Sequence, residues 1–219
     1  MIEAVVFDLD GVLLDSETAW NDVKRELALE AGGRWTEEAP TTMLGMSSPE
    51  WSRFMHDELS VPLEPQAISA GVVERLAARY RAALPIIPGA VEAVERIASR
   101  WPLGLASSSN PEIIELVLEQ SGLADRFAVA LSSQETGRGK PAPDVYLAAL
   151  EALGVQPRVS VAIEDSGNGI RAAHSAGMRV VAIPNPDFPP GDEALAQAAV
   201  VLNSIAELTP AVVTYSAAA

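Results

Sequence analysis

Short runs of apolar residues alternate with stretches of helical periodicity along most of this chain. The apolar runs predict strands at residues 4–7, 103–106, 128–131, 159–163, 180–183 and 200–202. Continuous apolar runs are typical of strands that are buried on both faces, as in a parallel sheet. Between the later runs, helical periodicity predicts helices at residues 90–99, 111–121, 143–153, 169–176 and 192–198. This alternation predicts an α/β fold with a doubly wound, Rossmann-like parallel sheet.

The segment from residue 16 to residue 84 has a different pattern, with helical periodicity and no predicted strand. It predicts one helix at 17–30 and another at 66–83. Between them it predicts a third helix that begins near Ser48, with Ser48 as the N-cap. A strand before such a segment can find partners only in the later sheet. We therefore expect an α/β core of residues 1–15 and 85–219 that carries residues 16–84 as an inserted helical cap. The final residues, 215–219, predict a frayed tail.

Composition narrows the class of protein. A chain of 219 residues with 48% hydrophobic content can bury a substantial core. The formal net charge of −15 argues against nucleic acid or an anionic membrane as a partner. The absence of cysteine excludes a disulfide framework, and neither a signal peptide nor a membrane-spanning stretch is visible. We expect a cytoplasmic monomer whose partner is a small molecule.

Two carboxylates follow the first predicted strand. Side chains alternate along a strand, so Asp8 and Asp10 leave its end pointing in the same direction. Ligands of doubly wound sheets bind at the carboxyl ends of the strands. Two acids there form an oxygen site suited to Mg²⁺, and they can divide nucleophilic attack and proton transfer between them. A strand-end turn facing solvent is the alternative, and Gly11 allows close backbone approach in either case.

Later strand ends carry further polar side chains. A run of hydroxyls, Ser107, Ser108 and Ser109, precedes Asn110 and provides either a phosphate cradle or ordinary helix capping. Lys140 is one of only two lysines and stands between glycine and proline. Its compact charge suits holding a carboxylate beside a phosphoryl dianion, although a solvated loop lysine would look the same.

A fourth strand end carries two acids. Glu164 and Asp165 follow the apolar run at 159–163 and precede a predicted helix. They can complete a Mg²⁺ site begun by Asp8 and Asp10, or they can stabilise the positive end of the helix. Each of these features is ambiguous alone, but their shared position at strand ends favours a single site.

In this order the motifs resemble those of the haloacid dehalogenase-like phosphatase superfamily. The matching residues are Asp8-Leu9-Asp10-Gly11, Ser107, Lys140 and Glu164-Asp165. The surrounding stretches at 15–17 and 139–144 are similar to the branch with a helical cap, which includes β-phosphoglucomutase and many sugar-phosphate phosphatases. The resemblance covers nearly the whole chain. It implies a Mg²⁺-dependent phosphomonoester hydrolase that acts on a small phosphorylated metabolite, expected to be a sugar or polyol phosphate.

The resemblance also implies a role for each matching residue. Asp8 would attack phosphorus and form an aspartyl-phosphate, and Asp10 would act as general acid and then as general base. Ser107 would hydrogen-bond the phosphoryl oxygens, and Lys140 would neutralise charge. The implied Mg²⁺ ligands are the Asp8 side chain, the Asp10 backbone carbonyl and Asp165, with Glu164 in support. The residues expected to contact substrate are Gly11, Ser108, Ser109, Asn110 and Trp20.

Two other interpretations stay open. A phosphomutase similar to β-phosphoglucomutase is disfavoured, because Trp20 stands where those relatives carry a histidine and the loop at 44–48 has no basic residue. The remaining cap cations, Lys24 among them, are predicted to lie mostly on solvated helix faces. A non-catalytic module that binds a phosphorylated ligand is disfavoured by the complete set of motif residues. The presence of Asp10 sets dehalogenases and phosphonatases aside.

Overall fold

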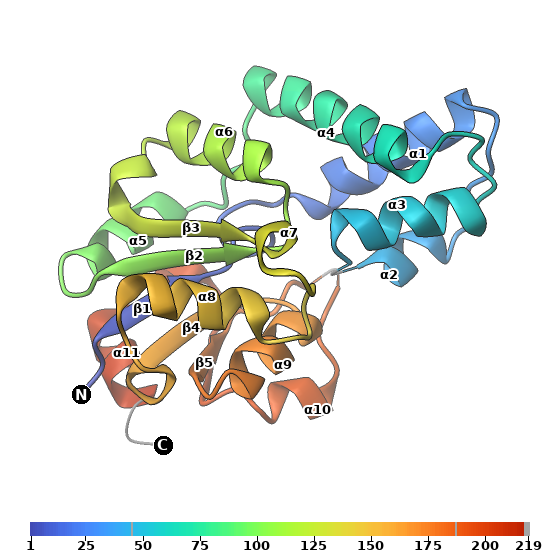
Figure 1. Cartoon of the computed structure of the whole chain (residues 1–219). Coiled ribbons are helices and arrows are strands. Elements are labelled where there is room, and N and C mark those ends of the chain that lie inside the picture. Colours follow the sequence, from blue (N-terminus) through green and yellow to red (C-terminus); the bar gives the residue numbers. More distant parts are fainter. Residues whose placement is uncertain (45, 187, 217–219) are drawn as a thin grey trace.

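A six-stranded parallel sheet forms the centre of the protein (Figure 1). The computed structural model describes residues 1–44, 46–186 and 188–216. The strand order is β3-β2-β1-β4-β5-β6. The strands β2 and β3 therefore lie on one side of β1, and the later strands β4, β5 and β6 lie on the other. The strands are β1 (Ala4–Phe7), β2 (Leu103–Ser107), β3 (Phe127–Ser132), β4 (Ser160–Glu164), β5 (Arg179–Ala182) and β6 (Val200–Val201). The switch of direction lies between β1 and β4, where ligand crevices form in such sheets.

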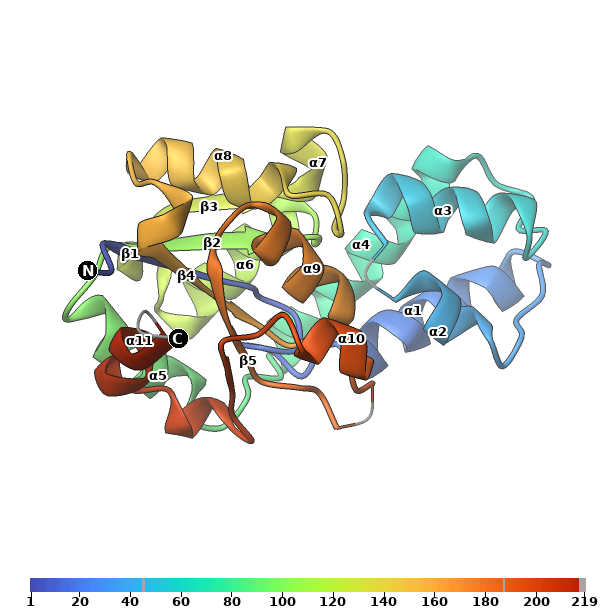
Figure 2. The same cartoon turned by 90° about the horizontal axis from the view of Figure 1, so that it is seen from below.

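Helices cover both faces of the sheet (Figure 2). Along β1, Val5 and Phe7 face one apolar cluster and Val6 faces the other, as the alternation of side chains requires. The first face is covered by α5 (Ala90–Ala98), α6 (Pro111–Ser121) and α11 (Pro210–Ser216). The second is covered by α8 (Asp144–Leu153), α9 (Gly167–Ser175) and α10 (Asp192–Leu195), with the short α7 (Ser133–Thr136) preceding α8. The doubly wound α/β prediction is confirmed.

Four helices lie together beyond the carboxyl ends of β2 and β3 (Figure 1). They are α1 (Glu17–Glu30), α2 (Ala39–Met43), α3 (Ser48–Asp57) and α4 (Pro65–Ala82). Helix α4 packs against both α1 and α3. A Cβ atom at Gly71 of α4 would lie 2.6 Å from Cδ1 of Leu27 on α1, so glycine permits this close helix contact.

The chain enters and leaves this group of helices through two paired connections. The N–H of Asp15 donates to the carbonyl of Pro85 (2.9 Å), and that of Ile87 donates to Leu13 (2.9 Å). Leu14 and Ile86 form an isolated antiparallel bridge between these bonds. The two connections therefore run side by side next to the end of β1.

Some local predictions differ from the structure. The N-cap of α3 is Ser47 and not Ser48, because Ser47 forms a capping box with Glu50. The short helices α2 and α7 were not predicted, since each is too brief to show a period. Tyr215 belongs to α11 and not to a tail, because Val213 anchors that helix in the core; residues 217–219 lie outside the described residues. Within the described ranges, no helix is both long enough and apolar enough to cross a membrane.

Candidate active site

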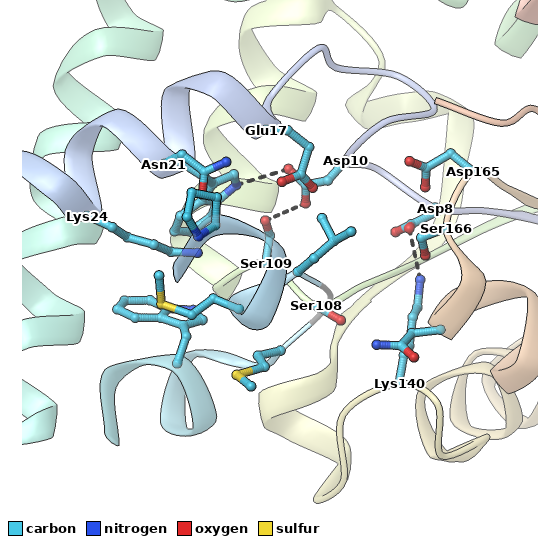
Figure 3. A pocket seen from close by; sticks show the side chains of 17 residues that line it. Asp8, Asp10, Glu17, Asn21, Lys24, Ser108, Ser109, Lys140, Asp165 and Ser166 are labelled. Atoms are coloured by element: carbon cyan, nitrogen blue, oxygen red, sulfur yellow. Dashed lines mark hydrogen bonds and ion pairs between the residues drawn. The ribbon is translucent and has the colours of Figure 1, made fainter. Parts of the chain in front are cut away.

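The polar strand ends converge on one cavity between the sheet and helices α1–α3 (Figure 3). Strand β1 delivers Asp8, the segment after β2 delivers Ser108 and Ser109, and the turn after β4 delivers Asp165. Lys140 reaches the same cavity from the loop before α8.

Lys140 lies between two buried carboxylates. Its Nζ is 3.0 Å from Oδ2 of Asp8 and donates to Oε1 of Glu164 at 2.7 Å. The hydroxyl of Tyr146 donates to the same Glu164 oxygen at 2.6 Å. Burial opposes the charge of Lys140, but the two carboxylates outweigh it and raise the Lys140 pKa above its ordinary value. The lysine therefore stays cationic and fixes Asp8 at the cavity wall.

Three carboxylates crowd around this single cation. One oxygen each of Asp8, Glu164 and Asp165 lie within 4.8 Å of one another, and all three residues are buried. Burial and the neighbouring acids raise the pKa of Asp165 well above its ordinary value, and burial likewise raises that of Asp8. A set of oxygen donors with excess negative charge suits a hard divalent cation, which would favour the ionised carboxylates. The cluster could thus bind a metal ion.

Two glycines are required beside these acids. A Cβ atom at Gly11, where φ is +75°, would overlap the carboxyl group of Asp165. A Cβ atom at Gly169 on α9 would overlap the carboxyl group of Glu164. Gly11 therefore supports the acidic cluster through backbone approach, and it is not part of the cavity lining around Asp8.

Asp10 has a different environment from Asp8. Its Oδ1 accepts hydrogen bonds from Oγ of Ser16 (2.6 Å) and Nε1 of Trp20 (3.1 Å). Its Oδ2 accepts from Oγ of Ser109 (2.6 Å) and Oγ of Ser107 (3.3 Å). The carboxylate points away from Asp165 and toward α1 (Figure 3). Two of its donors come from residues 16–84, one is the last residue of β2 and one lies in the segment after β2, so Asp10 connects these parts of the protein.

Ser107, Ser108 and Asn110, which were predicted from the polar run at 107–110, occupy three different positions. Ser107 is fully buried and accepts a hydrogen bond from the N–H of Ser109 (2.9 Å), so it lies behind the cavity wall. Ser108 lines the cavity, and its buried Oγ has no hydrogen-bond partner among the described residues. Asn110 occupies the N-cap position of α6 but accepts from Oγ of Ser48 (2.6 Å) on α3. It lies outside the cavity lining and connects the sheet domain to the helices.

Helix α1 contributes a wall of the cavity, of which only Trp20 was predicted to contact substrate. Glu17, Trp20, Asn21 and Lys24 line the cavity from one face of α1, and Trp51 of α3 lines it beside them. The prediction that Lys24 is solvated is wrong, because the side chain is buried with its ammonium between the rings of Trp20 and Trp51. The sequence could have indicated this wall, because residues 17, 20, 21 and 24 have the spacing i, i+3, i+4, i+7 that places side chains on one face of a helix.

The ionisable groups on this wall have shifted pKa values. Burial, reinforced by nearby Asp10, raises the pKa of Glu17 to about 7. Burial lowers the pKa of Lys24 to about 8, although the carboxylates of Glu17 and Asp10 oppose that shift. Desolvation is the first cause in both cases, and it outweighs the attraction between Glu17 and Lys24, which opposes both shifts.

The two lysines of this chain allow a direct test. In protein labelled with ¹³C-lysine, the two side chains should give two Cε signals. The Lys24 signal is assigned as the one that disappears in Lys24→Met. We expect the Lys24 signal to titrate with a midpoint of about 8. The Lys140 signal should stay in its charged form across that range, because its carboxylates raise its pKa. A Lys24 midpoint at the ordinary value of 10.5 would mean that the side chain is solvated.

Comparison with known proteins agrees with this geometry. The family model of haloacid dehalogenase-like hydrolases matches residues 2–177. Hexitol phosphatase B of Escherichia coli strain K12 is 34% identical over 216 residues, covering 95% of this chain and 95% of that protein. The structure of CbbY from Rhodobacter sphaeroides in complex with phosphate has a TM-score of 0.87 at 29% identity, covering 98% of this chain and 100% of that one. The structure of β-phosphoglucomutase from Clostridium difficile has a TM-score of 0.85 at 25% identity, covering 100% of this chain and 98% of that one.

The chain therefore belongs to the haloacid dehalogenase-like hydrolases. The family inferred from the four motifs is confirmed, and so is the likeness to sugar-phosphate phosphatases and to β-phosphoglucomutase.

Proposed function

We propose that this protein is a Mg²⁺-dependent phosphatase that hydrolyses a small phosphomonoester, a sugar or polyol phosphate, through an aspartyl-phosphate. The observation that carries the proposal is the position of Asp8 at the carboxyl end of the parallel sheet. Its buried carboxylate lies 3.0 Å from the buried ammonium of Lys140. Phosphoryl transfer requires positioning and charge neutralisation, which this arrangement provides. The likeness to hexitol phosphatase B and to CbbY, whose structure holds phosphate, supports the same reaction class.

The proposed reaction has two steps. A carboxylate oxygen of Asp8 attacks phosphorus, the bond from phosphorus to the leaving oxygen breaks, and Asp10 gives that oxygen its proton. Water then attacks the aspartyl-phosphate, Asp10 takes a proton from it, and inorganic phosphate leaves with Asp8 restored. Three of the four groups bonded to Asp10 are serine hydroxyls, which can rotate from donor to acceptor. The Asp10 carboxyl can thus gain and lose a proton while keeping its partners.

Residues in the cavity wall and behind it assist both steps. Lys140 would offset charge on the phosphoryl oxygens, and the unpartnered Oγ of Ser108 is available to donate to them. We assign Ser107 to holding Asp10 and Ser109 in place. The metal ligands would be Asp8, Asp165 and the backbone carbonyl of Asp10, with Glu164 in support. When bound, Mg²⁺ would supply positive charge to the phosphoryl group and to the excess carboxylates.

We further propose that residues 16–84 act as a cap on a core of residues 1–15 and 85–219. The cap supplies the wall of α1 and two donors to Asp10, so a closed position is needed to complete the site. Such closure excludes water from the reacting groups. Small-angle scattering with and without beryllofluoride should show a more compact protein when the phosphoryl mimic is bound, whereas an unchanged profile would contradict a moving cap.

The reaction is tested by phosphate release with Mg²⁺ present. The protein should hydrolyse p-nitrophenyl phosphate and release phosphate from sugar or polyol monophosphates without a bisphosphate activator. The phosphomutase alternative predicts conversion of β-glucose 1-phosphate to glucose 6-phosphate that a bisphosphate stimulates and that exceeds phosphate release. Binding of phosphorylated ligands without any turnover would identify a non-catalytic module.

Removal of the metal or of its ligand should stop the reaction. We expect EDTA to abolish phosphate release and added Mg²⁺ to restore it. Asp165→Ala should weaken the apparent affinity for Mg²⁺, measured as the concentration that gives half-maximal activity, by roughly 10- to 100-fold. Asp125→Ala, which removes an exposed carboxylate away from the cavity, serves as the control. An unchanged Mg²⁺ requirement in Asp165→Ala would exclude this residue as a ligand.

A further inference from the structure

A cation without a partner lies in the cavity wall on the opposite side from Asp8 (Figure 3). Lys24 is 6% exposed, and within the described residues its ammonium has neither an ion pair within 4.0 Å nor a hydrogen bond. The Nζ atom lies 5.2 Å from the ring centroid of Trp20 and 5.0 Å from that of Trp51. The two indoles attract the cation but are poor hydrogen-bond acceptors, so its N–H groups remain available to a ligand.

The neighbours of Lys24 are polar at one end and aromatic at the sides. Glu17 provides a carboxyl group and Asn21 provides an amide, both on the cavity face of α1. Trp20 and Trp51 pack edge to face with centroids 6.1 Å apart. We call these four residues, together with Lys24, the Lys24 subsite. It offers acceptors, donors and apolar ring surface within one small part of the cavity.

We propose that the Lys24 subsite binds the hydroxyl-bearing end of the substrate, with Lys24 donating hydrogen bonds to its hydroxyl oxygens. A hydroxyl both donates and accepts, so it matches a surface that carries an ammonium, a carboxyl and an amide together. The indole rings suit the C–H surface of a carbohydrate chain. The inference rests on the proposed function, because the phosphate must lie at Asp8 for the other end to reach α1.

Trp20 fixes the direction of the substrate across the cavity. Its Nε1 donates to Asp10, the proposed acid for the leaving oxygen, while Lys24 lies over its ring. A substrate whose leaving oxygen meets Asp10 would extend along Trp20 before it reaches Lys24.

A second anion fits this part of the cavity less well than hydroxyls. Glu17 lines the same wall, and Asp10 lies at the other edge of Trp20, so an incoming carboxylate or phosphate would approach two acids as well as one lysine. No arginine lines the cavity among the described residues. Positive charge at the subsite is thus limited to Lys24.

The test compares substrates that differ at the far end only. A panel of pentitol and hexitol phosphates is assayed beside hexyl phosphate, which has length without hydroxyls, and 6-phosphogluconate, which adds a carboxylate. The wild type should prefer the best polyol phosphate over hexyl phosphate in kcat/KM. In Lys24→Met this preference should fall about 10- to 100-fold, mainly through KM, since a hydrogen bond from a charged donor is lost. Arg25→Met removes an exposed cation from the next position of α1 and should keep the wild-type preference.

Two results would overturn the inference. Equal losses with polyol and hexyl phosphates in Lys24→Met would reduce Lys24 to a packing role. A wild-type preference for 6-phosphogluconate that Lys24→Met abolishes would make the subsite an anion site. Failure of the proposed function is distinct from both, because the wild type would then release no phosphate from any of these compounds or from p-nitrophenyl phosphate.

A second measurement does not depend on the folding of the variant. An unreactive hexitol phosphonate is added to wild-type protein labelled with ¹³C-lysine, in the presence of Mg²⁺. The Lys24 Cε signal should shift with this ligand and not with hexyl phosphonate of the same length. An equal response of the Lys24 signal to both ligands would contradict contact between Lys24 and hydroxyls. So would a Lys24 signal that does not shift with either ligand while the Lys140 signal does.

Discussion

Asp8→Asn is expected to lower phosphate release by about 10⁴-fold or more, because an amide is a poor nucleophile and a poor metal ligand. The fold should persist, since Lys140 keeps its 2.7 Å bond to Glu164 and Asn has nearly the shape of Asp. The substitution also removes one of three crowded carboxylates, so the thermal midpoint should stay the same or rise. Steady-state phosphate release and thermal unfolding followed by circular dichroism measure the two effects.

The nucleophile can also be trapped. Beryllofluoride should inhibit the wild type by mimicking a phosphoryl group on Asp8, and Asp8→Asn should no longer bind it tightly. The control is Asp125→Asn, an exposed carboxylate away from the cavity, which should retain wild-type turnover and inhibition. Turnover in Asp8→Asn within tenfold of the wild type would mean that another group attacks phosphorus.

Asp10→Asn is expected to lower turnover of alkyl phosphates by roughly 10²- to 10⁴-fold, the usual contribution of a positioned general acid and base. The loss in the first step should be much smaller with p-nitrophenyl phosphate, whose leaving group needs no proton. Because the second step still needs a base, nitrophenol should then appear as a burst in rapid-mixing experiments. Mg²⁺ affinity should change little, since the proposed ligand at this position is the backbone carbonyl.

The pattern of losses separates Asp10 from a purely structural residue. If Asp10 only held Trp20 and Ser109 in place, the loss in Asp10→Asn would be independent of the leaving group. Ser109→Ala removes the 2.6 Å hydrogen bond from Oγ of Ser109 to Oδ2 of Asp10 and keeps the Asp10 carboxylate. It should therefore cost less than Asp10→Asn and should retain the wild-type dependence on the leaving group. A loss below about tenfold with an alkyl phosphate would rule out Asp10 as the acid.

The sheet and the acidic cluster were predictable because local sequence determines them. Apolar runs such as 4–7 and 159–163 are typical of strands buried on both faces, and the carboxyl ends of parallel strands share one edge. Asp8 and Asp165 therefore had to approach each other once both strands were placed beside one another. The meeting of Lys140 with Asp8 followed from the family resemblance, since no local pattern fixes the path of its loop.

The side of the site that α1 and α3 form was less predictable because it depends on how helices pack. Lys24 lies on an amphipathic helix whose polar face could equally meet solvent, and only the position of α3, with Trp51, encloses it. Asn110 stands before Pro111, a pattern that predicts helix capping, yet its side chain accepts from Ser48, which is 62 residues away in sequence. Such contacts between distant segments leave no periodic signal in either one.

The paired connections at Asp15–Pro85 and Leu13–Ile87 have a consequence for the ancestry of such enzymes. Because the chain leaves and rejoins the sheet domain at one point, the inserted helices can be lengthened, shortened or replaced without changing the strand order. Recombination at this junction would join a new recognition surface to an intact set of reacting groups. A chimera that keeps residues 1–15 and 85–219 and takes its helices from a relative would be expected to fold and to acquire the donor's substrate preference.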